Sequence, residues 1–181
     1  MNNPIADTEL VNRTKRRDLM DSNQMTPVEG TVDISIPVDV LWEFFAQPYL
    51  WPDWNPCFFW VMNQTLEAGK QLIWAFQPIR RWYLYKMPAM AKIVELREKR
   101  RVTWEVSALP GFYALHAYSV EPTGKNRCRF GSWEKAMGWG FGLMKPFWLA
   151  HFRFVRDASL AGAGSLERRY RSQGILSPEM V

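Results

Sequence analysis

The side chains of this sequence best suited to acid–base chemistry are His116 and Glu134. They lie in consecutive segments, 113–121 and 127–137, whose apolar residues alternate as in β-strands. Consecutive strands usually pair, so we expect His116 and Glu134 to lie close together. An imidazole with a carboxylate beside it can move protons in the enolisation or dehydration of a β-keto compound. A structural histidine and a solvated glutamate near a strand end are the alternatives.

Aromatic side chains are numerous and provide candidate walls for a ligand cavity. They make up 15% of the chain, with 10 Trp and 11 Phe, more than one small core requires. A tyrosine hydroxyl inside an apolar cavity can polarise a ligand carbonyl, so Tyr118 is a third catalytic candidate. Ordinary core packing is the alternative for each ring. The predicted ligand-binding residues are Trp74, Phe76, Trp104, Tyr113, Phe130, Trp148 and Phe152.

Two further segments suggest a gate or a membrane contact. Residues 78–88 alternate basic and aromatic side chains, a mixture that suits a membrane interface. Residues 138–142 read Gly-Trp-Gly-Phe-Gly, which predicts a flexible hinge and lacks the spacing of a nucleotide-binding loop. A lengthened hairpin and a simple turn are the alternatives. The predicted gate or membrane-loop residues are Arg81, Trp82, Tyr83, Trp139 and Phe141.

Composition argues against several other classes of protein. The two histidines and two cysteines are widely separated, so we expect no metal site and no cofactor. We place the second histidine, His151, beside the apolar stripe of a helix rather than in a ligand site. The net charge of +5 comes from dispersed basic residues without a nucleic-acid-binding motif, which predicts at most weak contact with an anionic membrane surface and no nucleic-acid partner.

The same features predict a cytoplasmic location. Cys57 and Cys128 do not form a disulfide framework, which suits a reducing compartment. No run of about 18 apolar residues occurs, and the first thirty residues lack the apolar core of a signal peptide. Either a monomer or a homodimer is compatible with the aromatic excess.

The elements that must position these residues follow from changes in the apolar period. Residues 31–36 alternate as in a strand, and Pro37 then introduces helical spacing up to Phe45. Three prolines turn the chain between residues 48 and 56. Six more strands with short connections predict an antiparallel meander. We expect these strands at 58–64, 72–76, 89–97, 101–108, 113–121 and 127–137.

The last third of the chain has the period of a long amphipathic helix. From Met144 to Leu166, apolar residues recur every three to four positions, and Pro146 suits the first turn. Gly162 and Gly164 predict a bend or a close contact. We therefore expect three parts: a flexible extension at 1–27 with room for a short helix around 8–19, a domain at 28–172 and a tail at 173–181.

Three patches of the sequence carry a resemblance to a known family. They are Ile36–Phe45 with Trp-Pro-Asp-Trp-Asn-Pro at 51–56, Arg-Val-Thr-Trp at 101–104, and the segments 109–111, 116–122 and 127–134. In these patches the chain resembles the START/Bet v 1-like superfamily, and within it the polyketide cyclase/dehydrase and lipid-binding branch. The resemblance implies an α+β helix-grip fold, in which a seven-stranded curved antiparallel sheet wraps around a long C-terminal helix. Two short helices follow the first strand, and a cavity is enclosed.

A fold by itself does not determine a function, so the resemblance leaves three functional hypotheses open. The first is binding of a hydrophobic small molecule, such as a lipid, polyketide or isoprenoid, in the cavity. The second is a polyketide cyclase or dehydratase that uses His116 and Glu134, with Tyr118 or Tyr113 polarising a carbonyl. The third is a peripheral membrane lipid-transfer protein that uses the 78–88 loop.

Overall fold

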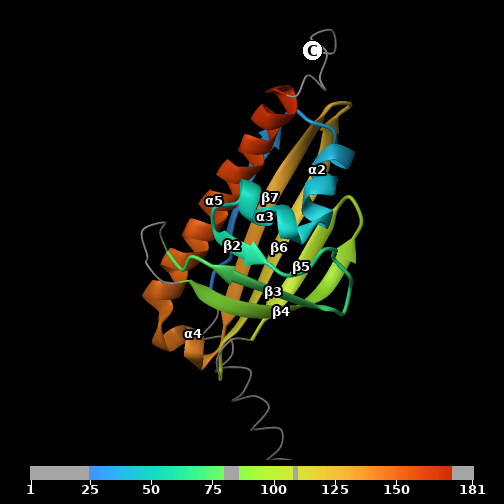
Figure 1. Cartoon of the computed structure of the whole chain (residues 1–181). Helices are drawn as coiled ribbons and strands as arrows, with labels where there is room; N and C mark the ends of the chain where they lie inside the picture. The colour runs from blue at the N-terminus through green and yellow to red at the C-terminus, as the bar shows by residue number, and fades with distance from the viewer. Residues whose placement is uncertain (1–24, 80–85, 108–109, 173–181) are drawn as a thin grey trace, which may run out of the picture.

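A seven-stranded antiparallel sheet, in the order β1-β7-β6-β5-β4-β3-β2, forms the frame of the molecule (Figure 1). The computed structural model describes residues 25–79, 86–107 and 110–172. The strands are β1 (Val28–Ile34), β2 (Phe58–Val61), β3 (Gln71–Phe76), β4 (Met87–Arg97), β5 (Arg101–Val106), β6 (Tyr113–Gly124) and β7 (Arg127–Met137). Every neighbouring pair is antiparallel, as the short connections predict.

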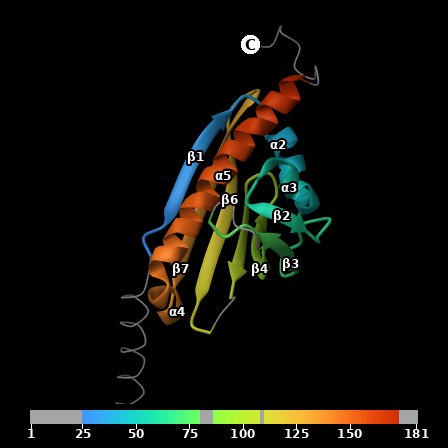
Figure 2. The ribbon, with the colours of Figure 1, turned by 60° about the vertical axis from the view of Figure 1, so that its left-hand side comes forward.

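Within the described residues, five helical segments accompany the sheet. They are α2 (Val38–Ala46), the 3₁₀ turn η1 (Pro48–Leu50), α3 (Trp51–Trp54), α4 (Trp139–Leu143) and α5 (Lys145–Ser172). The curved sheet wraps around α5, while α2 and α3 pack against the other end of the same face (Figures 1 and 2). The predicted helix-grip fold is therefore confirmed. None of the helices in the described ranges is both long and apolar enough to cross a membrane.

The helices form where the sequence supplies their start signals and apolar stripes. Pro37 precedes α2 and Asp39 lies in its first turn, near the positive end of the helix dipole. The buried residues of α2 include Leu41 and Phe45, one helical turn apart. The stripe predicted for the last third of the chain is likewise the buried face of α5.

The core is dominated by aromatic rings that the helices and the sheet contribute together. The Phe45 ring of α2 stacks on Phe130 of β7 at 5.1 Å between centroids and meets Trp54 edge-on at 5.2 Å. Trp51 packs on Trp104 of β5 at 5.5 Å. These pairs tie α2 and α3 to the centre of the sheet and close one end of the space beneath it.

Two differences from the sequence predictions concern the segment before α5 and the start of the packed domain. Residues 139–143 form the helix α4, where the sequence predicts a flexible hinge. The Gly140 N–H bonds to the Gly111 carbonyl, and a side chain at 140 would strike the Pro110 carbonyl, so α4 packs closely on residues 110 and 111. Met25 is buried and its N–H bonds to Ala136, so the packed domain begins before residue 28. Residues 1–24 of the predicted extension and the whole tail lie outside the described residues.

Candidate functional site

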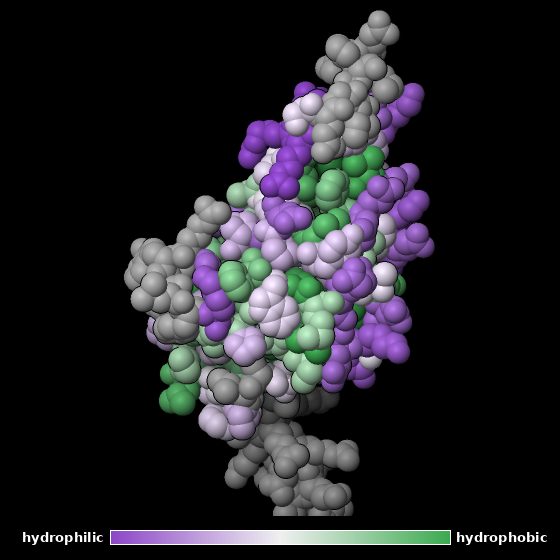
Figure 3. Space-filling model, viewed as in Figure 1, coloured by the Kyte–Doolittle hydropathy of each residue, from purple (hydrophilic) through white to green (hydrophobic). Residues whose placement is uncertain are grey.

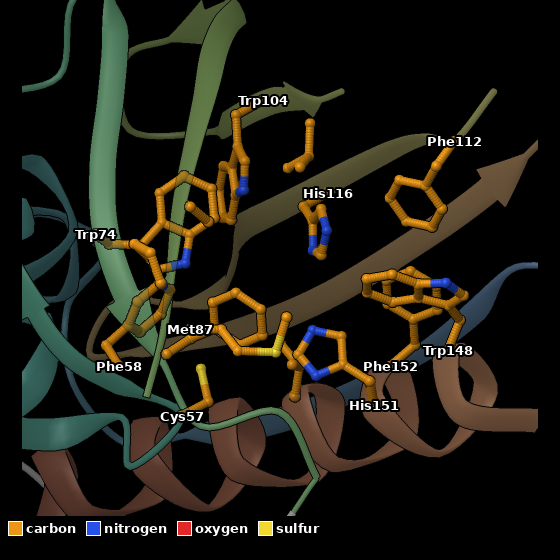
Figure 4. Close-up of a pocket in the computed structure, with 15 residues that line it drawn as sticks. Cys57, Phe58, Trp74, Met87, Trp104, Phe112, His116, Trp148, His151 and Phe152 are labelled. Atoms are coloured by element: carbon orange, nitrogen blue, oxygen red, sulfur yellow. The ribbon is translucent and has the colours of Figure 1, made fainter. Parts of the chain in front are cut away.

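A largely apolar cavity of about 70 Å³ lies between the sheet and α5 (Figure 4). Aromatic rings from β3, β5 and α5 form most of its wall, and its polar side chains are His116, His151 and Cys57. Its lining residues are Cys57, Phe58, Trp74, Phe76, Met87, Pro88, Ala89, Trp104, Val106, Phe112, His116, Trp148, His151, Phe152 and Val155. Apolar walls with a few polar groups are typical of sites for small organic ligands.

The predicted acid–base pair comes together at the wall of this cavity. His116 of β6 lies directly opposite Glu134 of β7 in the sheet register, and its Nδ1 is 3.6 Å from the Glu134 carboxylate. Trp104 faces His116 from the other side, on β5, and the two rings are stacked at 5.7 Å with planes only 3° apart. The Phe152 ring of α5 covers His116 edge-on at 5.6 Å. Packing on both faces therefore holds the imidazole in one orientation.

Glu134 lies behind His116, away from solvent. Its exposed fraction is 1%, and neither carboxylate oxygen accepts a hydrogen bond from any described residue. Burial raises the pKa of Glu134, whereas the nearby His116 and Arg156 act in the opposite direction. A buried carboxylate with one imidazole neighbour can hold that ring in place and stabilise it when it gains a proton.

The second histidine also reaches the cavity, from α5. The His151 ring is buried and contacts Phe76 at 4.9 Å and Phe152 at 5.5 Å between ring centroids. Its Nδ1 is hydrogen-bonded to the carbonyl oxygen of Pro78. Burial lowers the pKa of His151 to about 3, so the ring is neutral at physiological pH. Both histidines of the chain thus line one cavity.

Tyr118, the third catalytic candidate, lies in a separate buried cluster. Its hydroxyl is 2.8 Å from the Ser159 hydroxyl and accepts a hydrogen bond from the Asn55 amide at 3.0 Å. The Asn55 side chain also bonds to Ser159 and accepts the Cys57 N–H. Tyr118 does not line the cavity, and its hydroxyl already has two partners. This cluster joins the end of α3 to β6 and α5.

The predicted ligand-binding residues divide into two groups. Trp74, Phe76, Trp104, Trp148 and Phe152 all line the cavity. Phe130 packs instead against Phe45 in the core. Tyr113 does not line the cavity either, because its position in β6 alternates with that of His116, on the other face of the sheet. There it neighbours Glu105. Partial burial, together with the hydrogen bond to that carboxylate and its negative charge, raises the pKa of Tyr113 to about 12.

The predicted gate residues also separate. Phe141 is fully buried, whereas Trp139 is 62% exposed, and Leu143 and Met144 extend this apolar surface around α4. Figure 3 shows apolar residues at this corner of the molecule. The indole of Trp139 lies against Gly111, whose φ of +71° and close contact leave no room for a side chain. Arg81, Trp82 and Tyr83 lie outside the described residues.

Sequence reasoning missed several residues of the cavity wall, above all His151, Met87 and Phe112. The helical period predicted His151 beside the apolar stripe rather than in a ligand site, whereas the structure places it on the buried face of α5 and in the cavity wall. A usable signal was that His151 lies four positions before Val155 and one before Phe152, on the stripe that faces the sheet. Phe112, which packs on Trp148 at 4.2 Å, precedes β6 and had no periodic signal.

Solved structures with the same fold include enzymes and a START protein. The ZhuI aromatase/cyclase from Streptomyces sp. R1128 is 17% identical, with a TM-score of 0.63 over 82% of this chain and 98% of that one. Norcoclaurine synthase from Thalictrum flavum is 16% identical, with a TM-score of 0.57 over 82% and 90%. A START superfamily protein from Mycobacterium smegmatis is 13% identical, with a TM-score of 0.57 over 81% and 98%. At these identities the likeness establishes the fold alone.

The comparison with curated proteins finds no match. A family model described as polyketide cyclase / dehydrase and lipid transport matches residues 25–171, which is nearly the whole of the described chain. The chain therefore belongs to the polyketide cyclase/dehydrase and lipid transport family.

Proposed function

We propose that this protein binds a small hydrophobic molecule in the cavity between the sheet and α5. The observation that carries the proposal is the cavity itself, whose wall is aromatic and whose polar side chains are confined to one cysteine and two histidines. Membership of a family of cyclases and lipid transporters supports a hydrophobic ligand.

The volume of the cavity sets a condition on the ligand. An apolar cavity of about 150 Å³ holds one benzene molecule, and this cavity has only about 70 Å³. A polyketide or lipid would therefore have to displace side chains of the wall. Met87 is suited to this movement, because it is half-buried at the cavity and a methionine side chain rearranges at low cost.

Filling the cavity should abolish ligand binding. The variant Val155→Phe places an extra ring where the ligand would lie, and we expect it to weaken binding of the neutral fluorophore N-phenylnaphthylamine at least about tenfold, as burial of apolar surface is lost. Val94→Phe is the control, because Val94 of β4 is 44% exposed. Native mass spectrometry of the wild type and of both variants tests for a co-purified apolar molecule.

The binding proposal would be contradicted if the wild type carried no co-purified molecule and the fluorophore bound it no better than it bound Val155→Phe. The proposal would also be contradicted if Val94→Phe weakened fluorophore binding as much as Val155→Phe does, because the ring at position 94 lies on the surface and not in the cavity.

The pairing of His116 with the buried Glu134 favours a second candidate function, enolisation as part of a cyclase or dehydratase reaction. In this reaction His116 would remove a proton from the carbon between two carbonyl groups and return it to the enolate oxygen. Glu134 would hold the imidazole through Nδ1 and stabilise its protonated form. The apolar walls would exclude water and fold the substrate.

Deuterium exchange into benzoylacetone, followed by NMR in heavy water, tests this candidate. We expect the wild type to accelerate exchange of the central methylene protons. Glu134→Gln should reduce the acceleration about 100-fold, the low end of what general acid–base catalysis contributes. The control is Ser132→Ala, which removes a buried hydroxyl two residues away on the same strand and outside the cavity. If benzoylacetone binds but its deuterium exchange is not accelerated, the proposed binding function stands and the proposed enzymatic function is contradicted.

A further inference from the structure

The tautomer of His151 follows from its partner. Nδ1 is hydrogen-bonded to the carbonyl oxygen of Pro78, and a carbonyl oxygen only accepts hydrogen bonds. Nδ1 must therefore carry the hydrogen of the neutral ring, which leaves the lone pair on Nε2. The low pKa that burial imposes keeps the ring in this form at physiological pH. His151 thus presents a fixed hydrogen-bond acceptor.

That acceptor faces the cavity. Figure 4 shows His151 rising from α5 beneath His116, with one ring nitrogen turned towards the space between the two side chains and the other turned away from it. The Pro78 bond accounts for Nδ1, and no hydrogen bond from the described residues reaches Nε2. The surrounding wall is formed by rings such as Phe76 and Phe152. An acceptor in such surroundings loses free energy unless a donor occupies the space in front of it.

A ligand group that satisfies this nitrogen must carry a hydrogen. A ketone, ether or carboxylate at this position would place two acceptors against each other, whereas a hydroxyl or enol would donate. The rings on both sides suit an aromatic body, because stacked and edge-on contacts add to the burial of its surface. We propose that the cavity selects small aromatic ligands that bear a hydroxyl group, and that this hydroxyl donates its hydrogen bond to Nε2 of His151. This assignment of ligand class rests on the proposed binding function.

Phenol and toluene provide a matched pair of probes, since they differ only in a hydroxyl or methyl group. Their dissociation constants can be measured by NMR titration of the indole N–H signals of the cavity tryptophans. In His151→Phe the acceptor is lost and an aromatic ring is kept. The phenyl ring is larger than the imidazole and weakens both probes, so the ratio of their affinities is the readout. The affinity for phenol should fall at least about fivefold relative to that for toluene, because the phenol hydroxyl is then buried without a partner. In the control Val94→Ala, which trims an exposed side chain outside the cavity, both constants and their ratio should stay unchanged.

Three results would overturn the inference. If both probes bind the wild type and their ratio is the same in His151→Phe, the hydroxyl is not held by His151, although the cavity still binds ligands. If neither probe binds the wild type, the proposed binding function fails and the inference fails with it. The third result needs no variant: long-range ¹H–¹⁵N correlation on the wild type should give a protonated Nδ1 and an unprotonated Nε2 that shifts when phenol is added, and an unprotonated Nδ1 would refute the tautomer.

Discussion

Acidification from about pH 7 to about pH 4.5 should destabilise the wild-type protein by about 3 kcal/mol more than it destabilises His151→Phe. The pKa of His151 falls from its ordinary 6.5 to about 3 in the folded protein because the ring is buried. Below pH 6.5 the unfolded chain gains a proton that the folded chain does not bind, so stability falls as the pH decreases. The loss continues until about pH 3, where the folded ring also accepts a proton.

Other titrating groups do not disturb this comparison, because both proteins contain them. Burial raises the pKa of Glu134, so its contribution has the opposite sign and favours the folded state as the pH falls. Asp33, which is exposed and paired with Arg129 at 2.8 Å, has a lowered pKa and loses its contribution in acid. The loss of the Pro78 hydrogen bond in His151→Phe is an offset that does not depend on pH.

Urea unfolding followed by tryptophan fluorescence, at a series of pH values, measures both curves. The wild-type free energy of unfolding should fall more steeply than that of His151→Phe between pH 6.5 and pH 3, and the two curves should run parallel above pH 7. Parallel curves over the whole range would mean that His151 is not held neutral in the folded protein.

Gly162→Ala should destabilise the protein by about 2–3 kcal/mol and lower the melting temperature by about 5–10 °C. A Cβ atom at position 162 would lie 2.3 Å from the carbonyl oxygen of Trp54, so α3 and α5 would have to separate. The movement would also strain the hydrogen bond between Asn55 and Ser159, one turn earlier on α5. This cost exceeds the gain of about 1 kcal/mol that alanine brings to a helix interior.

Gly164→Ala is the matched control, two residues further along the same helix. Among the described residues, no atom outside the adjoining backbone of α5 lies within 4 Å of a Cβ built at that position, so alanine should stabilise the protein by about 0.5–1 kcal/mol through its helix propensity alone. Thermal unfolding followed by circular dichroism compares the two variants. The close packing of α3 on α5 would be refuted if both substitutions raised the melting temperature.

The sheet and the long helix both contribute residues to the site. The sequence predicts the contributions of each element but not the contacts between them. The pairing of His116 with Glu134 follows from two consecutive strands and a short turn, so it is local information. Most of the ring wall also follows, because β3, β5 and the α5 stripe each have a clear period. Tyr118 shares the face of His116, yet only the packing of α3 and α5 shows that its hydroxyl is already bonded to Asn55 and Ser159.

The sequence by itself determined the family, the order of the elements and the main apolar face of the strands and helices around the cavity, because apolar periods and turn residues act over short separations. Tertiary structure alone decided which inward residues meet an open space and which meet other side chains. His151 illustrates the difference, since residues 73 positions apart in the chain set its tautomer and direct Nε2 into the cavity. Such contacts depend on how α5 lies across the sheet, and no periodic pattern records that angle.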